Sequence, residues 1–208
     1  MFDYIRDPQE IYRRSFETLR AEADLSGLPD GMDTMAERII HACGMPDILT
    51  HLAWGGNPAT AGRAALEAGA PIITDADMVR AGIIKARLPA SNDLICTVHS
   101  PVAFEAAAEQ ATTRSAAAVT QWLPHLDGSV VVIGNAPTAL FRLLELLAEG
   151  APKPAAILGF PVGFIGAAES KDALIEHAGD IPFITLRGRL GGSAMASAAV
   201  NALGRARS

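Results

Sequence analysis

Two residues of the segment "RIIHACG" (38–44) have types and a spacing that could do acid–base chemistry. Arg38 and His41 are three positions apart, and residues at that spacing lie on one face of a helix. Gly44 is a typical helix stop, so His41 lies in the last turn, where the negative end of the helix dipole favours a protonated imidazole. Such a group is suited to act as a general acid near neutral pH. The same spacing also fits a surface histidine that only caps carbonyl groups.

The two cysteines carry a weaker signal. Cys96 lies within the apolar segment "LICTV" (94–98) and His99 directly follows it, so the two could in principle form a nucleophilic pair. Side chains alternate along a strand, however, so positions 96 and 99 face opposite sides unless the strand ends between them. The sequence has no CxxC motif and no cluster of histidines and cysteines at metal-ligand spacing, so no metal site is expected. A thiol enzyme that depends on Cys96 remains an alternative.

Three glycine-rich loops follow apolar segments that are typical of strands. Glycines let a ligand approach the backbone closely, and helix N-termini offer N–H groups to anions. In a parallel sheet such loops gather at the carboxyl ends of the strands, where ligands bind. They predict a wide site for a large ligand with several carboxylates or phosphates, although any α/β protein also needs tight turns there. The loops are "GNAPTA" (134–139), "GFPVGFIGAAESK" (159–171) and "RGRLGGSA" (187–194).

Charge and the absence of nucleotide motifs narrow the class of ligand. After Asp180 no acidic residue follows, so Arg187 and Arg189 either form a basic rim for an anionic small molecule or reflect an accidental bias. No GxGxxG motif follows the first strand, and "GFPVGFIG" lacks the lysine of a P-loop, so neither NAD nor ATP is predicted. The net charge of −6 argues against nucleic acid as a partner.

The elements that must position these residues change character near residue 70. Before it, helical patterns dominate: Asp7 and Pro8 begin the first helix, and short helices are expected at 47–54 and 59–68. After it, short apolar segments rich in β-branched residues alternate with segments of helical periodicity. This alternation predicts an open doubly wound α/β fold with a mainly parallel five-stranded sheet, helices on both faces and an N-terminal helical segment. The expected strands are 70–74, 94–98, 129–134, 154–160 and 182–188.

Length and composition limit the class of protein further. The chain has 208 residues, 50% of them hydrophobic, which suits one domain over 1–208. No apolar run reaches the roughly 18–20 residues of a membrane span. The segment "MFDYIRDPQE" carries charges where a signal peptide would be apolar. A cytoplasmic protein without a membrane partner is therefore expected.

Seven motifs together resemble the precorrin-8X methylmutase family of the cobalamin pathway. Each motif is short, but their joint occurrence in this order extends through nearly the whole chain and is highly specific. They are "DYIRDPQEIYRRSF" (3–16), "RIIHACG" (38–44), "AGAPIITDADMV" (68–79), "TRSAAA" (113–118), "GNAPTAL" (134–140), "PVGFIGAAESK" (161–171) and "RGRLGGSAMA" (187–196).

The resemblance implies an α/β fold, a homodimer and an isomerase activity. The family shifts a methyl group from C-11 to C-12 of precorrin-8X, giving hydrogenobyrinate, with no metal or organic cofactor. The histidine of the family's R-x-x-H motif, which falls on His41, is implied to be the acid–base group. The substrate is a flat, wide tetrapyrrole with acetate and propionate side chains, which agrees with the several anion-binding loops expected from the residues.

The resemblance also implies a set of substrate-binding residues. The serine of the family's S-F motif falls on Ser15, and the arginine of R-x-x-H falls on Arg38. Arg114, in "TRSAAA", is expected to bind a substrate carboxylate. Asn135, in "GNAPTAL", and Arg187, in "RGRLGGSAMA", complete the expected substrate-binding residues.

The sequence leaves two alternatives to this function open. A tetrapyrrole carrier would bind the ring without turnover. A cobalt-precorrin-8 methylmutase of the anaerobic route would act on a cobalt-containing ring, although the blocks "HACG" and "GNAPTALF" resemble the aerobic type and favour the metal-free substrate. The segment 46–63 matches no motif of the family and is expected at the surface or the rim of the site.

Overall fold

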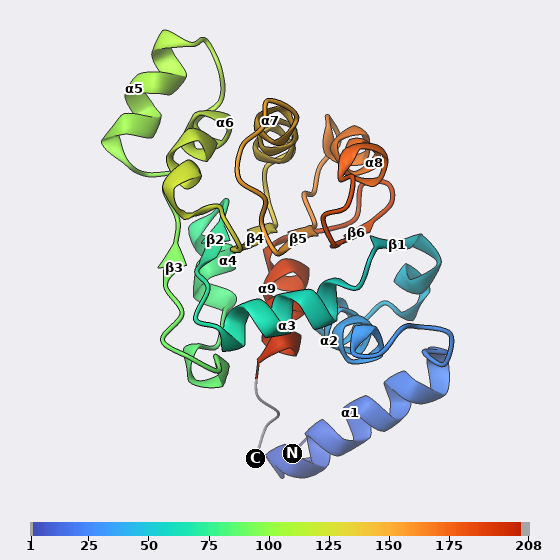
Figure 1. Ribbon diagram of the computed structural model, residues 1–208. Helices are drawn as coiled ribbons and strands as arrows, with labels where there is room; N and C mark the ends of the chain where they lie inside the picture. Colours follow the sequence, from blue (N-terminus) through green and yellow to red (C-terminus); the bar gives the residue numbers. More distant parts are fainter. Residues whose placement is uncertain (1, 205–208) are drawn as a thin grey trace.

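A sheet of six strands organises the protein (Figure 1). The computed structural model describes residues 2–204. The strand order is β1-β6-β5-β4-β2-β3, and each neighbouring pair is parallel except β1 with β6. The order of the parallel strands reverses at β2, which has β3 on one side and β4 on the other, as in doubly wound folds. The strands are β1 (Leu52–Gly55), β2 (Ile72–Thr74), β3 (Leu94–Ile95), β4 (Val130–Ile133), β5 (Ala156–Gly159) and β6 (Phe183–Leu186).

Helices cover both faces of the sheet (Figure 1). One face carries α6, α7 and α8, and the other carries α2, α3, α4 and α9. The predicted fold class is therefore confirmed. The helices are α1 (Pro8–Glu22), α2 (Met32–Cys43), α3 (Pro58–Glu67), α4 (Asp77–Gly82), α5 (Pro101–Glu109), α6 (Arg114–Val119), α7 (Pro137–Ala148), α8 (Ala167–His177) and α9 (Ser193–Leu203), with 3-10 turns η1 (Pro46–His51), η2 (Lys85–Arg87) and η3 (Thr120–His125).

The predicted number of strands is wrong by one. The sixth strand, β1, comes from the segment that was expected to form a short helix at 47–54 and to lie at the rim. The chain instead makes the turn η1 and then runs antiparallel to β6, with Leu52 opposite Leu186 and Gly55 opposite Phe183. A Cβ atom at Gly55 would lie 2.5 Å from the ring of Phe183, so glycine permits this pairing. A four-residue edge strand is too short to show a period of two.

Each face of the sheet has its own hydrophobic core, and β4 shows why the strands were recognisable. Val130 and Val132 belong to the core beneath α2, α3 and α9, whereas Val131 and Ile133 belong to the core beneath α7 and α8. All four side chains are fully buried. A strand covered on both faces is apolar at every position, which is the pattern of segment 129–134.

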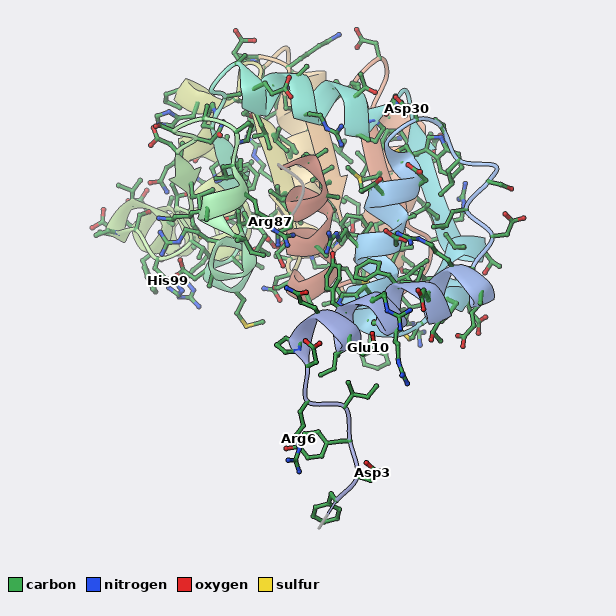
Figure 2. All side chains as sticks on the ribbon, turned by 90° about the horizontal axis from the view of Figure 1, so that it is seen from below. Asp3, Arg6, Glu10, Asp30, Arg87 and His99 are labelled. Carbon is green, nitrogen blue, oxygen red and sulfur yellow. The ribbon has the colours of Figure 1, made fainter. Side chains whose placement is uncertain are left out.

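Helix α1 lies outside α2, on the side away from the sheet (Figures 1 and 2). The Asp7 side chain caps α1 by accepting a hydrogen bond from the N–H of Gln9, and Phe16 and Leu19 bury its inner face. Helix α2 ends at Gly44, whose φ of +68° is the left-handed conformation predicted for a glycine stop. Within residues 2–204 no helix is both long and apolar enough to cross a membrane.

Candidate functional site

His41 lies at the end of α2, where α1 holds its ring on two sides. The Oγ atom of Ser15 is 3.1 Å from Nδ1 of His41. The ring of Phe16 stacks on the imidazole with centroids 4.7 Å apart and planes 23° apart, and Tyr12 meets it edge-on at 6.3 Å. His41 is nevertheless exposed. Because Nδ1 faces Ser15, Nε2 is the nitrogen left for a ligand, so this histidine is a positioned group rather than a free surface side chain.

Arg38 brings a positive charge to the same place. Its guanidinium lies 5.0 Å from the ring centroid of Phe16 and 5.6 Å from that of Tyr12, within the range of cation–π attraction. The structure therefore confirms that Arg38 and His41 share one face of α2, and it adds Ser15 to them. Tyr12 and Phe16 were not among the predicted site residues. The signal was in the sequence, since positions 12, 15 and 16 lie on one face of a helix.

Two hollows border this end of α2. The one beside His41 has a volume of about 190 Å³ and is lined by Ser15, Leu19 and their neighbours. A groove of about 460 Å³ begins at Ala42 and continues between α4 and α9. Ligand pockets for drug-sized molecules span roughly 300–1,000 Å³. The hollow at His41 therefore has room for only the edge of a ligand of that size.

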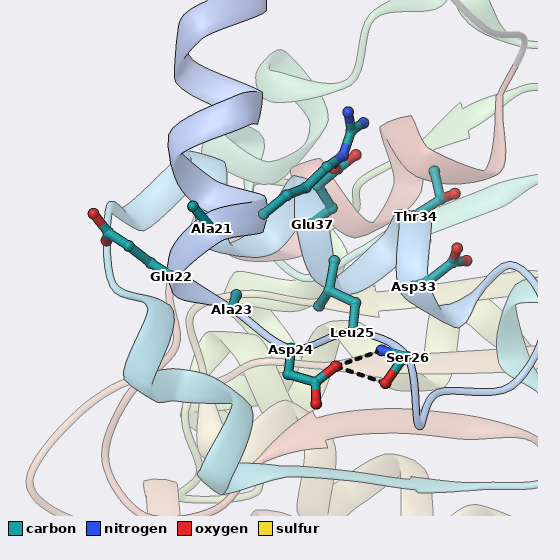
Figure 3. Close-up of a pocket in the computed structure, with 10 residues that line it drawn as sticks. Ala21, Glu22, Ala23, Asp24, Leu25, Ser26, Asp33, Thr34 and Glu37 are labelled. Carbon is teal, nitrogen blue, oxygen red and sulfur yellow. Dashed lines mark hydrogen bonds and ion pairs between the residues drawn. The ribbon is translucent and has the colours of Figure 1, made fainter.

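A third pocket lies at the far end of the α1–α2 pair and has the opposite electrostatic character (Figure 3). Its volume is about 720 Å³, and the Arg20 side chain on its wall binds Glu37 at 2.5 Å. Three further acidic residues, Glu22, Asp24 and Asp33, surround it. With four carboxylates and one arginine, this pocket does not suit an anionic ligand.

The loop after β4 differs from its prediction in one respect. Its backbone N–H groups were expected to receive a ligand's anion, but those of Gly134, Asn135 and Ala136 donate to the carboxylate of Asp75, at 2.9, 2.9 and 2.7 Å. Asp75 is 2% exposed, and burial raises the pKa of its carboxyl group while the three N–H groups act in the opposite direction. The part of the prediction that concerns these three N–H groups is therefore wrong.

The other two glycine-rich loops are joined to each other by hydrogen bonds. The N–H of Gly192 donates to the carbonyl of Phe160 at 2.8 Å, and the N–H of Gly163 donates to the carbonyl of Arg189 at 3.5 Å. The buried Lys171 of α8 donates from Nζ to the carbonyl of Leu190 at 2.6 Å. The loops after β5 and β6 therefore form one connected edge of the sheet, as expected for a shared site.

The remaining predicted residues lie away from His41. Arg114 is exposed at the start of α6, with its guanidinium 4.7 Å from the ring centroid of Phe104. Asn135 is exposed on the loop after β4. Arg187 is 3.6 Å from Asp172, in a pair with both side chains more than half exposed. No hydrogen bond, ion pair or ring contact within residues 2–204 joins these three residues to His41.

The proposed pair of Cys96 and His99 finds no support in the geometry. His99 Nε2 lies 3.5 Å from Asp77 Oδ2, and Arg80 binds the same carboxylate at 2.6 Å. Burial raises the pKa of the half-buried Cys96 thiol, which disfavours the thiolate that a nucleophile requires. Within the described part of the chain, no group of histidine, cysteine and acidic side chains could hold a metal ion.

Lys171 gives a testable dependence of stability on pH. Burial lowers the pKa of its ammonium group from 10.5 to about 8, against the attraction of Asp172. At pH values between these two pKa values, the unfolded chain binds more protons than the folded chain. The free energy of unfolding therefore rises with pH, by up to about 3 kcal/mol. Urea unfolding from pH 7.5 to 10 should show this rise in the wild type relative to Lys171→Met. The same dependence of the free energy of unfolding on pH in both proteins would contradict this prediction.

The fold and the site together define a class of protein. A doubly wound sheet carries one positioned histidine, and an internal carboxylate fills the place where such folds bind nucleotide phosphates. This is an α/β protein with a candidate acid–base site.

Comparison with known proteins identifies the family. The family model CbiC, precorrin-8X methylmutase, matches residues 10–206. Precorrin-8X methylmutase of Pseudomonas aeruginosa is 58% identical over 203 residues, covering 98% of each chain, and that of a Sinorhizobium species is 56% identical over 98% of this chain and 97% of its own. The crystal structure of precorrin-8X methylmutase from Thermus thermophilus superposes with a TM-score of 0.84 at 36% identity, covering 94% of each chain.

The chain belongs to the precorrin-8X methylmutase family. The predictions of family and of an isomerase of the methylmutase type in cobalamin biosynthesis are therefore confirmed.

Proposed function

We propose that the protein shifts a methyl group from C-11 to C-12 of precorrin-8X to give hydrogenobyrinate, with His41 as the general acid. The observation that carries the proposal is the contact between Ser15 and His41 Nδ1, which leaves Nε2 for the substrate. The stack with Phe16 fixes the plane of the ring, while the side chain stays exposed. A general acid needs this combination of fixed orientation, a donor nitrogen and access.

The chemistry follows from the two states of the imidazole. A proton delivered by Nε2 to the conjugated macrocycle withdraws electron density from the migration terminus and lowers the barrier to the methyl shift. The Nδ1–H group donates to Ser15 Oγ both before and after this transfer, so the ring keeps its orientation. The substrate and the product of an intramolecular shift are isomers of each other. The proton therefore returns to Nε2 after the shift, and no net proton is consumed.

Arginines and polar side chains bind the periphery of the substrate in this proposal. Ser15 and Arg38 contact the tetrapyrrole beside His41. Acetate or propionate groups farther away are bound by Arg114, Asn135 and Arg187. The exposure of the last three residues supports these roles, since each is accessible on a loop or at a helix start. Guanidinium groups suit carboxylates because they can donate two parallel hydrogen bonds.

The natural substrate in this proposal is the metal-free ring. The two relatives above 50% identity carry the name precorrin-8X methylmutase. A relative named cobalt-precorrin-8 methylmutase, from Priestia megaterium, is 34% identical over 94% of this chain. The difference in identity favours precorrin-8X over its cobalt-containing counterpart.

We also propose that the protein acts as a cytoplasmic homodimer whose residues 1–208 form one domain. Phe164 and Ile165 are 85% and 91% exposed at the tip of the loop after β5, and exposed apolar side chains of this size support an interface between copies. The two cysteines are free thiols, which fits a reducing compartment.

An absorbance time course with precorrin-8X tests the proposed function. The purified protein should convert the substrate to the orange product over many turnovers. Binding without spectral change over time would mean that the protein is a tetrapyrrole carrier. Conversion of only the cobalt-containing ring would assign it to the other branch of the family.

A further inference from the structure

Asp75 occupies the point at which the order of the strands reverses. It directly follows β2, whose neighbours are β3 on one side and β4 on the other. Its N–H donates to the carbonyl of Val132 at 3.2 Å, so the backbone here continues the pairing of β2 with β4. In doubly wound folds the crevice at this point binds ligands, and backbone N–H groups at the start of the next helix receive their anionic group.

In this protein the anion is part of the chain. Oδ1 of Asp75 accepts from Gly134, and Oδ2 accepts from both Asn135 and Ala136, immediately before α7 begins at Pro137. The bond to Asn135 crosses 60 positions of sequence, so it ties two distant segments together. A carboxylate can accept all three bonds, whereas an amide would turn its own N–H donors toward one part of the loop.

The loop that Asp75 holds leads to residues of the proposed substrate site. Asn135 is exposed on it, and the carbonyl of Asn135 accepts from the N–H of Val162 in the next loop at 3.4 Å. Thr138, the second residue of α7, shares a hydrogen bond of 2.8 Å with Thr113. Thr113 caps α6 and directly precedes Arg114. A change at Asp75 therefore reaches two expected substrate contacts: Asn135 through its own N–H, and Arg114 through Thr138 and Thr113.

We propose that Asp75 is a positioning residue of the substrate site: its buried carboxylate stands where a ligand's anion binds in related folds and holds the loop 134–138 so that Asn135 and Arg114 are presented to the tetrapyrrole. The inference rests on the proposed function, since it concerns the same site. The carboxylate also occupies three backbone N–H groups that would otherwise be available to a phosphate.

The variant Asp75→Asn tests the proposal through a split between KM and kcat. It should raise KM for precorrin-8X about tenfold or more and leave kcat within about threefold, because the displaced groups bind the substrate and its transition state equally. Amide exchange at 134–136 should become faster than in the wild type. The matched control is Asp127→Asn, which changes an exposed aspartate before β4. It should alter neither KM, nor kcat, nor amide exchange at 134–136.

A double substitution separates positioning from a general structural role. Asn135→Ala should raise KM in the wild type but have little further effect in the Asp75→Asn background, since the loop is already displaced. A loss of active protein with unchanged KM, or fully additive effects, would overturn the proposal. If Asp75→Asn does not fold, Thr138→Val takes its place, and an unchanged KM in that variant would overturn it equally.

The outcome can be distinguished from a failure of the proposed function. If the wild type binds but does not convert precorrin-8X, the proposed function fails. The dissociation constant for hydrogenobyrinate, measured by absorbance titration, then replaces KM. An Asp75→Asn protein that binds this ring as tightly as the wild type would overturn the positioning role.

Discussion

Replacing His41 by alanine is expected to lower kcat for methyl migration by about 10²–10⁴-fold, which is the usual contribution of a general acid. KM should change by less than about fivefold, since an effect confined to the transition state lowers kcat and kcat/KM alike. The physical reason is that Nε2 of His41 is the donor nitrogen that Ser15 leaves free. The measurement is the absorbance time course with precorrin-8X at saturating concentration.

A matched control tests whether the loss belongs to this histidine. His177→Ala removes an exposed histidine at the end of α8, on the opposite face of the sheet from α2, and should retain wild-type turnover. His41→Ala should also fold normally, because His41 is exposed and belongs to neither hydrophobic core. Near-normal turnover by a folded His41→Ala protein would exclude the general-acid role.

The sequence predicted the positions of Arg38 and His41 because the signals for them are local. Arg38 and His41 lie three positions apart on one helix, and Gly44 ends it, so spacing alone placed them together. Ser15 lies on a different helix, and its contact with His41 depends on how α1 packs against α2. The resemblance named Ser15 as a substrate contact, whereas the structure adds a bond to the imidazole that no spacing rule contains.

The features that the sequence did not predict, the role of Asp75 and strand β1, depend on contacts between distant segments. Asp75 reads as one polar residue after a buried strand, and only the pairing of β2 with β4 brings it to the N–H groups of Gly134 and Asn135. Strand β1 was missed for a similar reason, since four residues are recognisable as a strand only once β6 lies beside them. By contrast, β4 was predictable because burial on both faces makes a strand apolar at every position.

The three predicted glycine-rich loops also show which features are local and which depend on the tertiary fold. The sequence indicated that three glycine-rich loops share one edge of the sheet, and the bonds from Gly192 to Phe160 and from Gly163 to Arg189 are consistent with this. It did not indicate which N–H groups remain available to a ligand. That distinction requires knowledge of internal acceptors such as Asp75, which are set by the tertiary fold.

Gly191→Ala is expected to raise KM for precorrin-8X by about 10- to 100-fold, because it forces the loops after β5 and β6 apart. A Cβ atom at Gly191 would lie 2.5 Å from the carbonyl oxygen of Pro161 and closer still to that of Phe160. Real Cβ atoms do not approach backbone oxygens so closely, and neither loop can yield by rotating a side chain. The backbone between Arg187 and Gly192 must therefore move.

The displacement breaks bonds that connect the two loops. The N–H of Gly192 donates to Phe160, and Lys171 donates to Leu190, so movement of this segment removes partners from buried polar groups. Overpacking of this kind costs about 1–3 kcal/mol in the free energy of unfolding. Urea unfolding should show that loss, while the circular dichroism spectrum stays close to that of the wild type.

Gly27→Ala is the matched control for this prediction. It makes the same chemical change at a glycine with no atom within 4 Å of the added Cβ, and it should alter neither KM nor stability by a measurable amount. If Gly191→Ala loses stability but keeps its KM, the loop from Arg187 onward is not part of the substrate site. The proposed carboxylate contact of Arg187 would then be wrong, and substrate binding would depend on α1, α2, Arg114 and the loop held by Asp75.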